Sequence, residues 1–276
     1  MRCPLALACL GLLALSAPAF AGTTPPGVNL RWDHCFADGG TANRTFACDT
    51  NSGLETMVMS FELDHAESGA SGVEVTIDMN SAAAAMPAWW TFKNPGTCRP
   101  SSVLASLTPP AGTLQCVEWS GGNASGGLAA YSINGLFASN QATLLAAFAV
   151  LPENLVNLSA GVEYFVGAIT INHAKTVGTG ACAGCQVPVC LFLTRLVVTF
   201  PPVAGQPSRD IPLGRGANGP ASQYATWQDG APINIVRGCS SANPFVCYPL
   251  VSYNCVLATT TSSRGSTWGA VKSLYR

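Results

Sequence analysis

Hydrophobic and polar residues alternate strictly over two stretches of the chain. The sequence reads MVMSFELD over residues 57–64 and VEVTIDM over residues 73–79. Because successive side chains of a strand point to opposite faces, this pattern predicts one buried and one solvent-facing side, as in an antiparallel sheet that covers a core. We therefore predict that 57–64 and 73–79 are two paired strands. Their solvent-facing side would carry four carboxylates, Glu62, Asp64, Glu74 and Asp78.

Further apolar segments predict more strands. Residues 161–171 are rich in β-branched and aromatic side chains, and residues 189–200 are apolar on both faces, as in a central strand. Residues 89–92 and 117–119 fit short strands, whereas 144–151 fits either a buried strand or a short helix. Gly, Pro and Asn turns join these segments, and no long helical period occurs. The chain is therefore predicted to be mostly β, an antiparallel β-sandwich of jelly-roll or immunoglobulin-like form.

The first 21 residues have the pattern of an export signal. Arg2 is the only charge before the apolar run 5–15, and Ala19-Phe20-Ala21 then matches a cleavage site. About a dozen apolar residues are too few to span a bilayer, which favours a cleaved signal over a membrane anchor. We expect residues 1–21 to be removed and the protein to be secreted or held at the cell surface.

The rest of the chain divides by composition. Residues 22–202 contain the predicted strands and form the predicted sandwich domain, which ends at Pro201-Pro202. Residues 203–258 are rich in Gly, Pro, Ser and Asn, and we predict a small disulfide-held appendage there. Residues 259–276 form a Ser/Thr-rich linker and a short tail, which is either a sorting signal or an ordinary chain end.

Charged residues are scarce, and this limits the classes of partner. They make up 10% of the chain. Removal of residues 1–21 would leave all 14 acidic residues and remove one of the 13 basic residues, Arg2. No basic stripe is present that would neutralise phosphates, which argues against nucleic-acid binding. After the signal, no apolar run reaches the roughly 18 residues of a membrane helix. The remaining partners are surface polysaccharide, other exported proteins or a second copy of the chain.

Cysteine content indicates how the fold is held together. Of the 12 cysteines, Cys3 and Cys9 fall in the signal, and export places the other ten in an oxidising compartment. Short spacings favour two local bridges, Cys35–Cys48 and Cys98–Cys116. Three of the remaining cysteines lie at 182–190 and three at 239–255, so at least one bridge would join the sandwich to the appendage. The predicted disulfide cysteines are Cys35, Cys48, Cys98, Cys116, Cys182, Cys185, Cys190, Cys239, Cys247 and Cys255.

The segment Cys182-Ala183-Gly184-Cys185, with Cys190 five residues later, is the sharpest local motif. A redox pair needs a CxxC at the start of a helix, and a zinc site needs a second CxxC or two suitably spaced histidines. The sequence offers neither context. We therefore favour structural disulfides, and we keep metal binding and redox chemistry as alternatives.

Aromatic residues suggest one binding hypothesis. Trp89, Trp90 and Trp119 could form a ligand platform, because planar rings stack on sugars. The two adjacent residues would point to opposite faces of a strand, so one of them would be exposed. Packing in the core is the alternative for each of the three.

Acidic residues suggest two further hypotheses. The carboxylates between Glu62 and Asp78 have a separation that a glycosidase pair can have, although an exposed sheet face explains them more simply. Asp33, Asp38 and Asp49 lie in the N-terminal loops and leave a loop-bound calcium ion open. No motif identifies a catalytic residue, and we predict no cofactor and no metal.

Two segments carry a resemblance to known sequences. Residues 172–190, NHAKTVGTGACAGCQVPVC, and residues 266–276, STWGAVKSLYR, resemble exported β-rich proteins of unassigned function from environmental bacteria. Those proteins share a CxxC-x4-C segment and a Trp-Gly-x-x-Lys-x-x-Tyr-Arg tail, and the resemblance implies bacterial export. The strand pair 57–64 and 73–79, with the step at 158–164, is also similar to cohesin-like sandwiches. That likeness concerns the fold and transfers no function.

Together, these features predict an exported, non-enzymatic β-sandwich of the cell surface or extracellular space that acts in adhesion, assembly or structural display. A carbohydrate-binding module that uses Trp90 or Trp119 is the first alternative. A polysaccharide-acting hydrolase with carboxylates near Glu62–Asp78 is the second.

Overall fold

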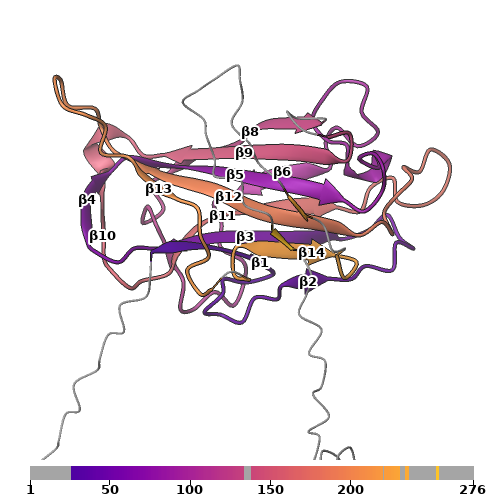
Figure 1. Cartoon of the computed structure of the whole chain (residues 1–276), viewed down its shortest axis with the longest axis horizontal. Helices are drawn as coiled ribbons and strands as arrows, with labels where there is room; N and C mark the ends of the chain where they lie inside the picture. Colours follow the sequence, from indigo (N-terminus) through magenta and orange to yellow (C-terminus); the bar gives the residue numbers. More distant parts are fainter. Residues whose placement is uncertain (1–25, 134–137, 220, 231–233, 236–252, 255–276) are drawn as a thin grey trace, which may run out of the picture.

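The computed structural model describes residues 26–133, 138–219, 221–230, 234–235 and 253–254, and it is an antiparallel β-sandwich, as predicted. Strands form two main sheets, with no α-helix among the described residues (Figure 1). The first sheet has the order β1 (Gly27–Trp32), β3 (Leu54–Glu62), β11 (Tyr164–Asn172) and β6 (Val103–Ser106), and β7 (Val117–Glu118) also pairs with β11.

The second sheet is the larger one. Its order is β2 (Asn43–Arg44), β14 (Tyr224–Trp227), β12 (Val189–Thr199), β5 (Gly72–Ser81), β9 (Gln141–Ala149) and β8 (Ser125–Ile133), and β13 (Ile211–Leu213) also pairs with β12. Two small pairs complete the described strands: β4 (Glu67–Ala70) with β10 (Val156–Leu158), and β15 (Asn234–Ile235) with β16 (Tyr253–Asn254). All pairs are antiparallel except β7–β11 and β2–β14.

One hydrophobic core lies between the two sheets, as the alternation predicts. Met57 and Met59 of β3 are buried in the same cluster as Val75 and Ile77 of β5. The central position predicted for 189–200 is also confirmed, because β12 lies between β14 and β5. The ambiguous segment at 144–151 is a strand, since β9 covers most of it.

The predicted pairing of 57–64 with 73–79 is wrong. Both strands form, but β3 pairs with β1 and β11, whereas β5 pairs with β9 and β12. The connection between them contains β4, which pairs with β10 instead of forming a tight hairpin turn. Alternation reports which face of a strand is buried, but it does not identify the neighbouring strand.

The predicted solvent-facing side is also wrong in part. Glu62 and Asp78 are each only 7% exposed. The Glu62 carboxylate accepts a hydrogen bond from Asn218 Nδ2 at 3.0 Å, and Asp78 accepts one from Thr143 Oγ1 at 2.9 Å. Because the outer faces of both sheets are buried at these points, their polar side chains need partners within the protein.

The strand predicted at 89–92 is wrong as well. Ala88–Trp90 forms a short 3-10 helix, η1, and Pro87 precedes it. The fixed φ of proline suits the residue that enters such a turn. In this conformation Trp89 and Trp90 do not alternate between two faces, and both are buried.

The sandwich does not end at residue 202 as predicted. Strands β13 and β14 pair with β12, so residues 211–227 include part of the second sheet rather than a separate appendage. Glycine and proline in this region mark the loops around short strands. The predicted export signal at 1–21, the predicted linker and tail at 259–276, and most of 231–258 lie outside the described residues.

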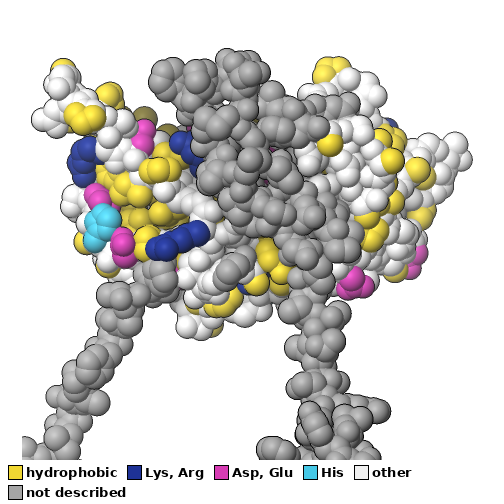
Figure 2. Space-filling model, in the orientation of Figure 1, with side chains coloured by type: hydrophobic (Ala, Val, Ile, Leu, Met, Phe, Trp, Pro, Cys, Tyr) yellow, Lys and Arg dark blue, Asp and Glu magenta, His cyan; other side chains and the backbone are white. Residues whose placement is uncertain are grey.

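The surface carries few charges. On the face shown in Figure 2, most described side chains are hydrophobic or uncharged, and several of the charged ones lie close together with a histidine at the left end. In the part of the chain that the structure describes, no helix has the length and hydropathy needed to cross a membrane.

Three disulfides tie distant segments together, and both predicted local bridges are wrong. The pairs are Cys35–Cys116, Cys48–Cys185 and Cys98–Cys182, with Cα–Cα distances of 6.1, 6.0 and 6.0 Å. A short spacing in sequence lowers the entropy cost of closing a loop, but the fold decides which cysteines come within bonding distance. Cys182 and Cys185 bond to different partners, so the CxxC segment is structural, as we favoured.

Cys190 bears on the predicted bridge between sandwich and appendage. It is disulfide-bonded, and the other six described cysteines are paired with one another. Its partner therefore lies outside the described residues. A bridge from Cys190 to one of the three cysteines at 239–255 stays a prediction.

Mass mapping of the unreduced protein tests this disulfide pattern. Proteolysis should release the three linked pairs of the structure, together with a peptide that joins Cys190 to Cys239, Cys247 or Cys255. The same digest after reduction is the control. A peptide that links Cys35 to Cys48, or a free thiol at Cys190, would contradict the pattern.

Candidate functional site on the outer face of the first sheet

Two loops cover the outer face of the first sheet. We call residues 33–42, which follow β1, and residues 107–116, which precede β7, the loop cover. Cys35 and Cys116 pack with Val58, Phe165 and Ala168 in a small hydrophobic cluster of their own. Val58 alternates along β3 with residues of the main core, so this cluster lies on the opposite side of the sheet. The Cys35–Cys116 disulfide thus joins the two loops over this face.

The Glu163 carboxylate binds the backbone of the first loop of the loop cover, residues 33–42. The residue directly precedes β11, and its carboxylate is buried. Oε1 accepts hydrogen bonds from the backbone N–H of Phe36 at 3.0 Å and from Asn29 Nδ2 at 3.0 Å, and the Ser60 hydroxyl also donates to it. Oε2 accepts from the backbone N–H of Ala37 at 2.7 Å. The carboxylate therefore joins β1, β3 and the loop cover.

Asp38 joins the two loops to each other. Its carboxylate accepts hydrogen bonds from the backbone N–H groups of Leu114, Gln115 and Cys116 at 3.0, 2.9 and 3.2 Å. Burial raises the pKa of Asp38, but these three donors and the charge of His34 outweigh it and hold the pKa below its ordinary value. The ionised carboxylate is thus the form that the second loop binds.

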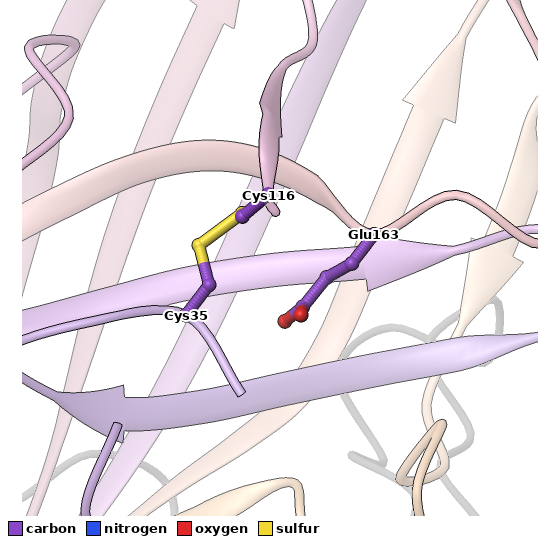
Figure 3. A group of neighbouring side chains, drawn as sticks. All are labelled: Cys35, Cys116 and Glu163. Carbon is purple, nitrogen blue, oxygen red and sulfur yellow. A yellow bond between two sulfur atoms is a disulfide. The ribbon is translucent and has the colours of Figure 1, made fainter. Parts of the chain in front are cut away.

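The same place contains the only close group of potential metal-ligating side chains in the described part of the chain. One ligand atom from each of Cys35, Cys116 and Glu163 lies within 4.8 Å of the others. Figure 3 shows the Glu163 side chain reaching toward the disulfide. The two sulfur atoms are bonded to each other and are not thiolates, and both carboxylate oxygens already accept hydrogen bonds. In its oxidised form the group is a structural junction and does not fit a metal ion.

Apolar side chains are exposed on the loop cover and beside it. Leu114 is 88% exposed, Val117 50% and Phe36 37%. Phe36 and Val117 each follow one of the two bonded cysteines, whose Cα atoms are 6.1 Å apart, so the three residues share one region of the surface. The guanidinium of Arg31 lies 5.1 Å from the centre of the Phe36 ring. Because the loops are fixed at several points, these side chains are presented in a defined arrangement.

The tryptophans predicted as a ligand platform are all in the interior. Trp89, Trp90 and Trp119 are at most 1% exposed. The Trp89 ring stacks on Trp227 and lies 3.6 Å from the guanidinium of Arg99, and its indole N–H donates to Thr176 Oγ1 at 3.0 Å. The platform hypothesis is therefore wrong for these residues. Their size and apolar area are used in the core, the alternative that we kept.

Arg99 supports this aromatic cluster through hydrogen bonds to backbone carbonyls. Its guanidinium donates to the backbone carbonyls of Trp89 at 2.7 Å, Ala174 at 3.0 Å and Asn172. Burial lowers the pKa of Arg99 to about 9. No local pattern in the sequence indicates this role, because a single arginine between Cys98 and Pro100 resembles an ordinary loop cation.

The other predicted acidic sites are not brought together. Glu62 and Asp78 lie on different sheets and on the outer side of each, so the hairpin that would have formed a glycosidase pair does not exist. Asp33 forms an ion pair with Arg44, and Asp49 is exposed. With Asp38 bound to backbone N–H groups, these three aspartates do not form a common ion site.

Two histidine networks had no clear signal in the sequence. His173 is buried, stacks on Phe46 at 3.8 Å between ring centres, and lies 3.1 Å from Glu55 Oε1. His65 is exposed between Asp64 and Glu67, and its hydrogen bonds to these two carboxylates raise its pKa. The His173 network joins segments that are distant in the sequence, whereas the His65 contacts stay within residues 64–67.

Comparison with family models, with curated proteins and with solved structures finds no match to this chain. The candidate site therefore rests on its own geometry. Among the described residues, we take the loop cover with its exposed apolar side chains as the candidate binding site.

Substitution of Glu163 tests whether its carboxylate holds the loop cover. Replacement by Leu leaves the N–H groups of Phe36 and Ala37 and two side-chain donors without their acceptor, and we expect the free energy of unfolding to fall by about 3 kcal/mol. Glu163→Gln should lose less, because the amide keeps one acceptor oxygen. The measurement is denaturant unfolding, and Glu153→Gln, at an exposed residue, is the control. Equal stability of Glu163→Leu and wild type would contradict the assignment.

Proposed function

We propose that the protein is exported and acts outside the cell as a non-enzymatic β-sandwich that binds other exported macromolecules through the loop cover. The single observation that carries this proposal is the exposure of Leu114 and Phe36 on loops that are joined by a disulfide, with Val117 exposed beside them at the start of β7. Large exposed apolar side chains are costly in water unless a partner covers them, and rigid loops lower the entropy cost of binding.

Other features are consistent with work in an oxidising environment. Three disulfides connect segments 81 to 137 residues apart, and such bonds persist mainly outside the reducing cytosol. The scarcity of charge favours a partner that is recognised by apolar and hydrogen-bonding contact rather than by its charge.

Binding of purified, labelled protein to the cells that produce it tests the proposal. Leu114→Ser should weaken binding about tenfold, since burying one leucine contributes roughly 1.5 kcal/mol. Leu151→Ser is the matched control, because Leu151 is also exposed but lies in the turn after β9. Equal binding of the Leu114→Ser variant and wild type would contradict a role of the loop cover.

The same preparation separates the alternatives. Binding on a glycan array that is insensitive to Leu114→Ser would favour a carbohydrate-binding module with a platform other than the buried tryptophans. Cleavage of a polysaccharide panel that disappears with Glu62→Gln would favour the hydrolase. Either result would overturn the proposal.

A further inference from the structure

Among the described residues, no strand pairs with the outer edge of the last strand of the second sheet, which we call its free edge. This strand, β8, is nine residues long, and β9 is its only strand neighbour in the part of the chain that the structure describes (Figure 1). Within the described residues, one hydrogen bond reaches the β8 backbone from outside this pair, from Asn94 Nδ2 to the Tyr131 carbonyl at 3.2 Å. An edge strand presents a row of backbone N–H and C=O groups, and such a row can pair with another strand.

The sequence of β8 lacks the residues that usually protect an edge. It reads SGGLAAYSI, with no charge and no proline. Five of its nine residues are exposed, and a Cβ atom added at Gly127 would meet nothing within 4 Å. A bulge between Leu128 and Ala130 is the one protective feature, and it leaves a regular run on each side.

The other edges of the two sheets are short or covered. The backbone of β1 is bonded on its outer side, where Val28 N–H donates to the Arg215 carbonyl at 2.7 Å and Leu30 N–H donates to the Ser222 carbonyl at 2.7 Å. The edge strands β6, β7 and β2 have four, two and two residues. Among these strands, β8 alone combines length, exposure and absence of charge.

We propose that the free edge of β8 pairs with the β8 strand of a second copy of this chain, antiparallel and related by a two-fold axis. In such a contact each strand meets its own sequence, so any charge on β8 would face a like charge near the axis. The uncharged β8 meets this requirement.

This contact is distinct from the loop cover. The loop cover lies on the outer face of the first sheet, whereas β8 is the edge of the second. The inference therefore goes beyond the proposed function, and each can fail without the other.

Sedimentation velocity of the purified mature protein tests the pairing. At about 100 μM, where a complex with a micromolar Kd is formed, the wild type should sediment as a dimer. Ala130→Lys places a charge on the outer side of β8, and we expect it to raise the Kd at least about tenfold, a cost of roughly 1.4 kcal/mol. Ala147→Lys is the matched control, because Ala147 is exposed on the same side of the sheet on β9, away from the edge, and it should leave the dimer intact.

Hydrogen exchange of the wild type decides the result independently of the variants. The amides of residues 125–133 should become more protected as the protein concentration rises. A wild type that stays monomeric at this concentration would overturn the proposal and leave the edge free for a strand of another protein. A dimer that survives Ala130→Lys without added protection in β8 would place the interface elsewhere and also overturn it.

Discussion

A loop that lies flat on a sheet removes its own backbone N–H groups from water, and each of these groups then needs an acceptor. In this protein two carboxylates supply the acceptors. Glu163 accepts hydrogen bonds from the N–H groups of Phe36 and Ala37, and Asp38 accepts hydrogen bonds from the N–H groups of residues 114–116. Without them, these N–H groups would lose their acceptors, and the two loops would lose the hydrogen bonds that join them to the sheet and to each other. The position of the exposed apolar side chains depends on these bonds.

The Cys35–Cys116 disulfide adds a covalent constraint to the same place. It joins two loops that are 81 residues apart in sequence, and a bond that closes a long loop lowers the entropy of the unfolded chain. The hydrogen bonds therefore act on the folded state, and the disulfide acts mainly on the unfolded state. The carboxylates stabilise the folded loops by accepting hydrogen bonds from backbone N–H groups. The disulfide limits how far the loops can separate when those hydrogen bonds break.

Local patterns in the sequence predict much of the fold but little of the site. Alternation identifies the buried face of β3 and β5 because it depends only on the two-residue period of a strand. It misplaces their pairing because neighbours are chosen by the whole topology. Pro87 and the aromatic pair after it fit either a strand or a tight turn, and the turn buries both rings. Glu163 is a single acidic residue before a strand, and no local pattern distinguishes it from a solvent-exposed one.

The central claim is that the carboxylates of Glu163 and Asp38 and a disulfide fix the loop cover, and residue-level hydrogen exchange by NMR tests it most directly. The account predicts that the amides of Phe36, Ala37, Leu114, Gln115 and Cys116 exchange slowly, at rates comparable to those of paired amides in β3. Exchange of these five amides at the rate of an unstructured chain, while the strands stay protected, would contradict it.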